Sequence, residues 1–244
     1  MIDLKLNSSA DLKKEGKSFY WASFFLPKSY KKNAGTLYSI CRYFDDIADK
    51  YSEDQTIYLK NSIEEIRTNK NNKVNIFLQK NEINNLIFID LIEGLILDQK
   101  KIRIQNKEEL IKYSYHVAGT VGLMMSKIIG VKHEKAARSA IDLGIGMQLT
   151  NIARDVYEDS KMKRIYLPAN WIPDISLKNL TDLHNKSSEK DERISNAIHD
   201  VIGLSDKFYK NGFAGLKYIP LSTRLGIFIA ANIYRGIGIK IKSN

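Results

Sequence analysis

Residues 148–159 read QLTNIARDVYED and constrain the architecture more than any other segment of this 244-residue chain. Asp155 and Asp159 are four residues apart, so on a helix they lie on one face, close enough to share a cation. At about 100° per residue, Gln148 and Asn151 fall with them inside an arc of roughly 80°. The flanking residues are apolar, which predicts a helix buried on most sides. Its polar stripe is therefore expected to face a cavity or a partner stripe.

A second acidic segment, DDIAD at residues 45–49, has the same spacing. Tyr38, Arg42, Asp45 and Asp49 fall within an arc of roughly 60° on a helix, again between apolar neighbours. An acidic pair of this kind often lies on a solvated face. Four carboxylates buried without compensation would instead be strongly unfavourable.

Divalent metal resolves that conflict. Hard oxygen ligands select Mg²⁺, Mn²⁺ or Ca²⁺, and Mg²⁺ is usually held by one or two carboxylates together with substrate phosphates. Arg42 and Arg154, each beside an acidic pair, would supply charge for phosphate oxygens. A di-iron bundle would need Glu-x-x-His motifs, and no histidine of this chain has a glutamate three residues before it.

Apolar residues elsewhere recur at three- and four-residue spacing, which predicts helices and a single all-α domain over residues 1–244. Trp21, Phe24 and Phe25 are expected in the core. Gly130 is expected to separate two helices, and the segment 166–187, with two prolines, to be an irregular loop. The predicted helices span residues 17–26, 29–50, 53–68, 82–100, 107–129, 132–160, 188–211 and 220–241.

The chain carries 38 Lys and Arg against 28 Asp and Glu, a net charge of +10. This surplus attracts polyanions in general, and a Lys-rich surface could hold the protein against an anionic membrane. No recognised nucleic-acid module accompanies the charge, so no nucleic-acid partner is expected. Cys41 is the single cysteine, which excludes an internal disulfide. Without a signal peptide or a bilayer-length apolar run, a cytoplasmic protein is expected, with peripheral membrane contact left open.

At this point the sequence resembles the squalene/phytoene synthases, which join two isoprenyl diphosphates head to head. The resemblance rests on segments spread in the family's order over most of the chain. They are Ser18–Ala22 with Leu26-Pro27, Leu37–Asp49, Asp90–Gly94, Tyr113 with Val117–Gly122, Gln148–Asp159, Arg164–Pro168 and Ala230–Arg235. Family members usually extend further beyond the last of these segments than the nine residues present here.

The resemblance implies an isoprenoid-synthase fold, a helical bundle around a deep central cavity. It implies Mg²⁺ ligands at Asp45, Asp49, Asp155 and Asp159, with Mn²⁺ as a substitute. It places Ser18, Arg42, Gln148, Asn151 and Arg154 at the substrate diphosphates, and Phe19, Tyr38, Tyr113 and Tyr234 at the reacting carbons. Gly119 and Gly122 could serve either close helix packing or direct approach to substrate.

The expected reaction is condensation of two geranylgeranyl diphosphates to phytoene through prephytoene diphosphate, a step of carotenoid biosynthesis. Two alternatives remain at this stage. Condensation of two farnesyl diphosphates would give presqualene diphosphate, squalene or dehydrosqualene, and squalene alone would require NADPH. A scaffold homologue without catalysis would be expected to have eroded acidic motifs, whereas both motifs are intact here.

Overall fold

The computed structural model describes residues 17–50, 52–99, 102–181 and 189–243, and the side chains of residues 17–19 lie outside this description. Across these ranges the chain is helical, and the only extended pairing is an isolated bridge between Arg103 and Ile165. The all-α prediction is therefore confirmed for the described part of the chain.

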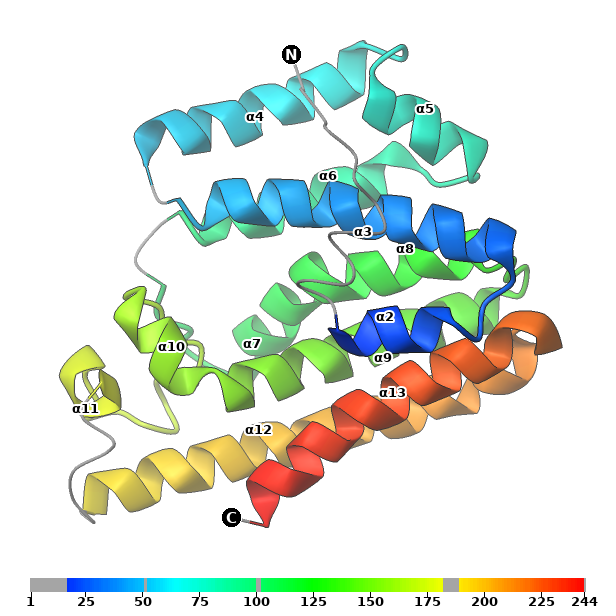
Figure 1. The fold of residues 1–244 in the computed structure, drawn as a ribbon. Coiled ribbons are helices and arrows are strands. Elements are labelled where there is room, and N and C mark those ends of the chain that lie inside the picture. The colour runs from blue at the N-terminus through cyan, green and yellow to red at the C-terminus, as the bar shows by residue number, and fades with distance from the viewer. Residues whose placement is uncertain (1–16, 51, 100–101, 182–188, 244) are drawn as a thin grey trace.

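The helices run in chain order as follows, with the labels of Figure 1. They are α2 (Lys17–Ser23), α3 (Lys28–Ala48), α4 (Glu53–Thr68), α5 (Lys73–Lys80), α6 (Asn85–Leu97), α7 (Lys107–Ser114), a π-helical turn (Tyr115–Gly119), α8 (Thr120–Ile128), α9 (Glu134–Arg154), α10 (Val156–Lys161), α11 (Leu177–Thr181), α12 (Glu189–Ala214), a 3₁₀ turn (Leu216–Tyr218) and α13 (Leu221–Lys242).

Helix α9 occupies the middle of the bundle, where it packs against α8, α12, α13 and the π-helical turn. Helices α4 and α5 lie on one side beyond α3 and α6, and α12 and α13 lie on the other side (Figure 1). Helix α2 runs beside α13. The C-terminal ends of α3 and α6 lie near α10, at the same end of the bundle.

Local sequence explains most helix starts. Pro27 and Pro220 immediately precede α3 and α13, and proline has the backbone angle and the missing donor that a helix start tolerates. The side chains of Ser52, Asn72 and Asn106 accept hydrogen bonds from the first turns of α4, α5 and α7, as N-cap residues do. Gly130 ends α8 with φ +79°, which glycine adopts without strain, so its predicted separating role is confirmed.

The structure differs from the prediction at three places. Helix α5 was not predicted, because it is short and is held through Asn75, whose buried amide donates to the carbonyls of Ile66 and Asn69 at the end of α4. The predicted helix 132–160 breaks at Asp155, which has φ −103° and ψ 16°. The predicted loop 166–187 contains α11, and its residues 182–188 lie outside the described part of the chain.

The prediction that Trp21, Phe24 and Phe25 belong to the core is wrong. Their exposed fractions are 64%, 53% and 47%. Helix α2 buries Ala22 and Ser23 instead, because α13 approaches it through Gly226, which lies against the carbonyl of Ala22 and the side chain of Leu26. The aromatic face of α2 is left on the outside.

Close helix packing depends on small residues around α9. A Cβ atom added to Gly144 would lie 2.2 Å from the carbonyl oxygen of Ala118, and one added to Gly122 would lie 2.2 Å from that of Ala140. Backbone atoms cannot move aside as a flexible side chain can. Gly122 and Gly144 therefore permit the contact between α8, the π-helical turn and α9.

We predict that Gly144→Ala destabilises the protein by about 1–3 kcal/mol, the typical cost of overpacking, despite the better helix propensity of alanine. Gly236→Ala is the matched control. It lies in α13 with no atom within 4 Å of the added methyl group, so it should raise stability by about 0.5–1 kcal/mol. Urea unfolding followed by circular dichroism measures both changes. Equal effects of the two substitutions would contradict the packing role.

Candidate active site

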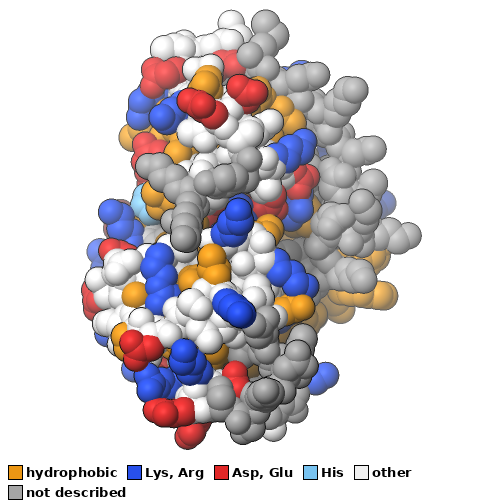
Figure 2. Space-filling view, turned by 90° about the vertical axis from the view of Figure 1, so that its left-hand side faces the viewer, with side chains coloured by type: hydrophobic (Ala, Val, Ile, Leu, Met, Phe, Trp, Pro, Cys, Tyr) orange, Lys and Arg blue, Asp and Glu red, His pale blue; other side chains and the backbone are white. Residues whose placement is uncertain are grey.

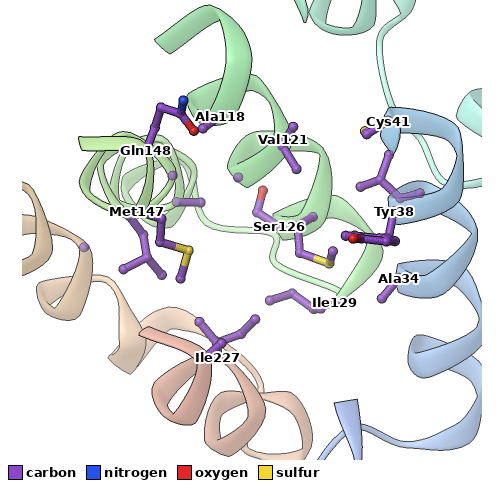
Figure 3. A pocket seen from close by; sticks show the side chains of 18 of the residues that line it. Ala34, Tyr38, Cys41, Ala118, Val121, Ser126, Ile129, Met147, Gln148 and Ile227 are labelled. Atoms are coloured by element: carbon purple, nitrogen blue, oxygen red, sulfur yellow. The ribbon is translucent and has the colours of Figure 1, made fainter. Parts of the chain in front are cut away.

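A cavity of about 370 Å³ lies inside the bundle, between α2, α3, α6, α8, α9 and α13. Side chains from α3, α8, α9 and α13 point into it (Figure 3). Most of its wall is apolar, with Leu91, Val121, Ile129 and Ile227 among the lining residues. A polar group also lines it, made of Tyr38, Arg42, Asp45, Asp98, Tyr113, Gln148, Asn151 and Tyr234. Each predicted stripe thus reaches the cavity through some of its residues, whereas Asp49, Arg154, Asp155 and Asp159 are not among the residues that line it.

The stripe of α3 reaches the cavity through Tyr38, Arg42 and Asp45. The Arg42 guanidinium donates to Asp45 at 2.9 Å and also pairs with Asp46 at 2.6 Å. One turn further on, Asp49 accepts a hydrogen bond of 2.9 Å from Arg164. Each aspartate of this motif therefore has an arginine beside it.

The stripe of α9 reaches the cavity through Gln148 and Asn151. Asn151 donates a long hydrogen bond of 3.4 Å to Gln148, and its own side-chain oxygen is buried without a hydrogen-bond partner. Arg154 binds both carboxylate oxygens of Asp155 at 2.6 Å. Although the helix breaks at Asp155, the amide of Asp159 donates to the Asp155 carbonyl at 2.8 Å. The two aspartates therefore stay one turn apart, as their spacing predicts.

Asp98, Arg164 and Tyr166 were not predicted as site residues. Arg164 connects the two acidic motifs, because its side chain binds Asp49 and its backbone amide donates to the Asp159 carbonyl at 2.9 Å. Arg164 reaches Asp49 with one nitrogen and the carbonyls of Ala48 and Asp98 with the other, at 3.4 Å each. The Asp98 carboxylate accepts hydrogen bonds from Tyr166 at 2.7 Å and from Tyr113 at 2.9 Å. The sequence does show that Asp98 is a charged residue directly after the apolar helix α6, which is a signal for a functional carboxylate. No spacing rule linked it to residues so distant in the chain.

Like charges and burial raise the pKa of several of these carboxyls. Burial is the main cause for Asp45, with Asp49 next, and together they raise its pKa to about 7. Burial and then Asp155 raise the pKa of Asp159 to about 7. Burial raises the pKa of Asp98 to about 6 against the opposing hydrogen bond from Tyr166. The charge of Asp98 acts on both Asp45 and Asp159, so the two acidic pairs lie within electrostatic reach of the same group.

The oxygen atoms of the aspartates and of Asn151 suit a cation that is coordinated partly by the protein and partly by a bound substrate. Among the described residues no three carboxylate, histidine or cysteine side chains come together to hold a metal ion alone. Asp45 with Asp49 and Asp155 with Asp159 each offer two carboxylates, and Asn151 offers an unpaired oxygen beside them. Mg²⁺ usually takes one or two carboxylates and completes its shell with water and phosphate oxygens. The residues present therefore fit Mg²⁺ bound jointly with a diphosphate.

Of the remaining predicted site residues, some line the cavity and others lie outside the described part of the chain. Tyr113 lines the cavity, but it is only 5% exposed and its hydroxyl donates to Asp98. Tyr234 lines the cavity from α13. The side chains of Ser18 and Phe19 lie outside the described part of the chain, so their predicted roles stay predictions. Cys41 also lines the cavity, and burial raises the pKa of its thiol to about 12, which keeps it protonated.

The sequence model of the squalene/phytoene synthases matches residues 12–244. The chain belongs to the squalene/phytoene synthase family. It is 31% identical to the 15-cis-phytoene synthase of Enterobacter agglomerans over 92% of this chain and 81% of that protein. It is also 31% identical to the phytoene synthase of Thermus thermophilus, over 95% of this chain and 81% of the relative. The chain is therefore a prenyltransferase.

Solved structures of the family share the architecture. A dehydrosqualene synthase in complex with a ligand superposes with a TM-score of 0.82 at 27% identity, over 93% of this chain and 82% of that one. The squalene synthase HpnC of Alicyclobacillus acidocaldarius has the same fold, with a TM-score of 0.80 at 18% identity over 99% and 96% of the two chains. The predicted isoprenoid-synthase fold is thus confirmed. Within the described residues, no helix is long and apolar enough to cross a bilayer.

We predict that the metal-free enzyme loses stability as pH rises from about 4 to about 7. The pKa values of Asp45 and Asp159 are near 7 in the fold against an ordinary 3.8. Across this window the folded state therefore retains protons that the unfolded chain has released, and the free energy of unfolding falls with pH. Urea midpoints at pH 5 and pH 8 in EDTA measure the change.

The double variant Asp45→Asn/Asp159→Asn is the control for this pH dependence. It removes two of the shifted carboxyls and leaves that of Asp98, so its urea midpoint should vary less between pH 5 and pH 8 than that of the parent. A urea midpoint of the parent that rises with pH would contradict the prediction. So would a double variant whose midpoint changes with pH as much as that of the parent, because the pKa values of Asp45 and Asp159 would then not be raised in the fold.

Proposed function

We propose that this enzyme condenses two geranylgeranyl diphosphates to phytoene through prephytoene diphosphate, with Mg²⁺ or Mn²⁺ as its metal. The supporting observation is that both polar stripes reach one apolar cavity, which Arg42, Asp45 and Asn151 line. The choice of a C20 substrate is supported by relatives named phytoene synthase, such as that of Enterobacter agglomerans, which align over most of this chain.

The polar end of the cavity would bind the diphosphates. Asp45, Asp49, Asp155 and Asp159 would hold the metal, which when bound neutralises the diphosphate and makes it a better leaving group. Arg42 and Arg154 form ion pairs with Asp45 and Asp155. When the diphosphate binds, each arginine could form ion pairs with phosphate oxygens instead. Ser18, Gln148 and Asn151 would donate hydrogen bonds to the same oxygens.

The apolar wall would then protect the reacting chains. Cleavage of the allylic C–O bond leaves a carbocation and a free diphosphate, and water must be kept from that cation. The double bond of the second chain attacks it, and loss of a proton yields the cyclopropylcarbinyl diphosphate. A second ionisation releases the other diphosphate, and the rearranged cation loses a second proton to give the neutral hydrocarbon. Phe19, Tyr38, Tyr113 and Tyr234 would stabilise the cations through their ring faces, worth about 2 kcal/mol when desolvated.

Two other functions would use the same fold. Condensation of farnesyl diphosphate to presqualene diphosphate, squalene or dehydrosqualene is favoured by the similarity to a dehydrosqualene synthase, and NADPH would be needed only for squalene. A scaffold without catalysis is the alternative of another class. The cavity and its acidic stripes argue against the scaffold, because a scaffold has no need of them.

We predict that labelled geranylgeranyl diphosphate and MgCl₂ give a C40 hydrocarbon with release of diphosphate, without NADPH. Products are extracted and separated by chromatography, and farnesyl diphosphate is tested in parallel with and without NADPH. If only a C30 product forms, farnesyl diphosphate is the substrate and the geranylgeranyl proposal is wrong. Absence of diphosphate release from either substrate would favour the scaffold.

We further predict that Asp159→Asn lowers kcat at least about 100-fold, the loss typical when a group that stabilises transition-state charge is removed. Helicity should be unchanged. Glu158→Gln is the matched control, because it removes a carboxylate from the neighbouring, exposed position, and its kcat should stay within about threefold of the parent. MgCl₂ should raise the melting temperature of the parent and of Glu158→Gln more than that of Asp159→Asn. Equal turnover by the two variants would contradict the metal role of Asp159.

A further inference from the structure

The net charge of the chain is concentrated in two segments. Residues 16–44 and 207–244 contain twelve Lys and Arg and no Asp or Glu. All other residues together carry 26 Lys and Arg against 28 Asp and Glu, so the surplus of +10 comes from these two segments. They include α2, most of α3 and all of α13. The fold brings them together, because α2 packs along α13 (Figure 1).

The same segments expose apolar side chains. Leu221, Leu225 and Phe228 of α13 are 79%, 51% and 47% exposed, and their spacing of four and three residues places them on one face of the helix. Trp21, Phe24 and Phe25 of α2 and the turn after it are exposed as well. We call these six residues the α2–α13 apolar face.

Aromatic and cationic groups are interleaved at the edge of this face. The Phe24 ring lies 5.0 Å from that of Tyr20 and 5.9 Å from that of Trp21, measured between centroids. The ammonium of Lys31 lies 3.9 Å from the centroid of Phe24. Lys28 and Lys32 are exposed nearby in the first turns of α3. Aromatic side chains with lysines beside them suit the boundary between headgroups and acyl chains.

Other parts of the surface are different. On the face shown in Figure 2, acidic side chains lie among the basic ones. Outside the two segments, Ile57 on α4 and Leu86 on α6 are exposed on helices that carry acidic residues. Ile76 is the exposed large apolar residue of α5, a short helix without an acidic residue. Among the described helices, several exposed apolar residues on segments without any acidic residue therefore occur together on the α2–α13 side.

The charge of the α2–α13 apolar face distinguishes between two possible partners, a second copy of the chain and an anionic bilayer. Asp206 of α12 pairs with Arg235 of α13, but the two segments themselves contain no carboxylate. Association of two copies through this face would therefore bring mainly basic side chains together, which is electrostatically unfavourable. An anionic bilayer offers both a complementary charge and an apolar interior. We propose that the α2–α13 apolar face docks on an anionic lipid surface, with its leucines and aromatic rings in the headgroup boundary and its lysines at the lipid phosphates.

Docking in this orientation would place the cavity next to the bilayer. Ala22 of α2, Leu26 of the turn after it, and Gly226 and Ile227 of α13 line the cavity on its near side. Helices α2 and α13 touch at Gly226, so only their thickness separates the cavity from the docked surface. If the proposed reaction is correct, an apolar hydrocarbon product would have a short path into lipid at this contact.

The test is sedimentation of the protein with vesicles of phosphatidylcholine, with and without phosphatidylglycerol. We expect at least about tenfold stronger partition to the anionic vesicles, weakened by high salt. Leu221→Glu/Leu225→Glu should lower that partition at least about tenfold. Leu86→Glu is the matched control, because Leu86 is 58% exposed on α6, and it should bind as the parent does. In a Trp171→Phe background, Trp21 emission should shift to the blue only with anionic vesicles.

Equal partition to both kinds of vesicle, or undiminished binding by Leu221→Glu/Leu225→Glu, would overturn the proposal. A dimer that forms without lipid and is broken by this double variant would assign the face to a second copy and overturn it too. Circular dichroism checks that the variants are folded. Binding is measured without substrate, and turnover of the double variant in detergent is expected to equal that of the parent. Failure of docking is thus distinguishable from failure of the proposed reaction.

Discussion

Carboxylates gathered at one end of an apolar cavity are the constraint on which the rest of the structure depends. The charge of Asp98 raises the pKa of both Asp45 and Asp159. Such an arrangement is unfavourable unless opposite charge offsets it. Within the protein that offset comes from arginines, each placed beside a particular aspartate. The site can therefore accept more positive charge, and under the proposed function a metal ion with a diphosphate would neutralise both the carboxylates and the arginines.

This constraint explains why residues from distant parts of the chain converge. Arg164 follows α10, yet it reaches Asp49 and the backbone at the ends of α3 and α6. Tyr113 and Tyr166 both donate to Asp98, so α7 and the segment after α10 are joined at that carboxylate. Breaking α9 at Asp155 turns α10 toward this cluster while the second acidic pair stays one turn apart. The polar end of the cavity thus also holds several helix ends together.

The inner and outer faces of α2 and α13 show a second consequence of packing. Their small residues, Ala22, Gly226 and Ala230, face inward and line the cavity. Ile227 and Tyr234 also line the cavity, but other large residues of the two helices, such as Trp21 and Leu221, are turned outward and exposed, although the residue type of Trp21 favours burial. Periodicity identified α13 as a helix but could not tell which of its faces would be covered. That depends on the size of the groups at the helix contact.

The sequence by itself determined the helical class, the long helices α3, α12 and α13, and the two stripes that meet at the cavity, because spacing along a helix decides which side chains share a face. It also carried the motifs of the family. Only the tertiary structure decided the roles of Asp98, Arg164 and Tyr166, the short helices α5 and α11, and the break at Asp155. The physical reason is that these features depend on contacts between residues far apart in the chain, where a buried amide, an arginine or a hydroxyl finds its partner only after the helices have packed.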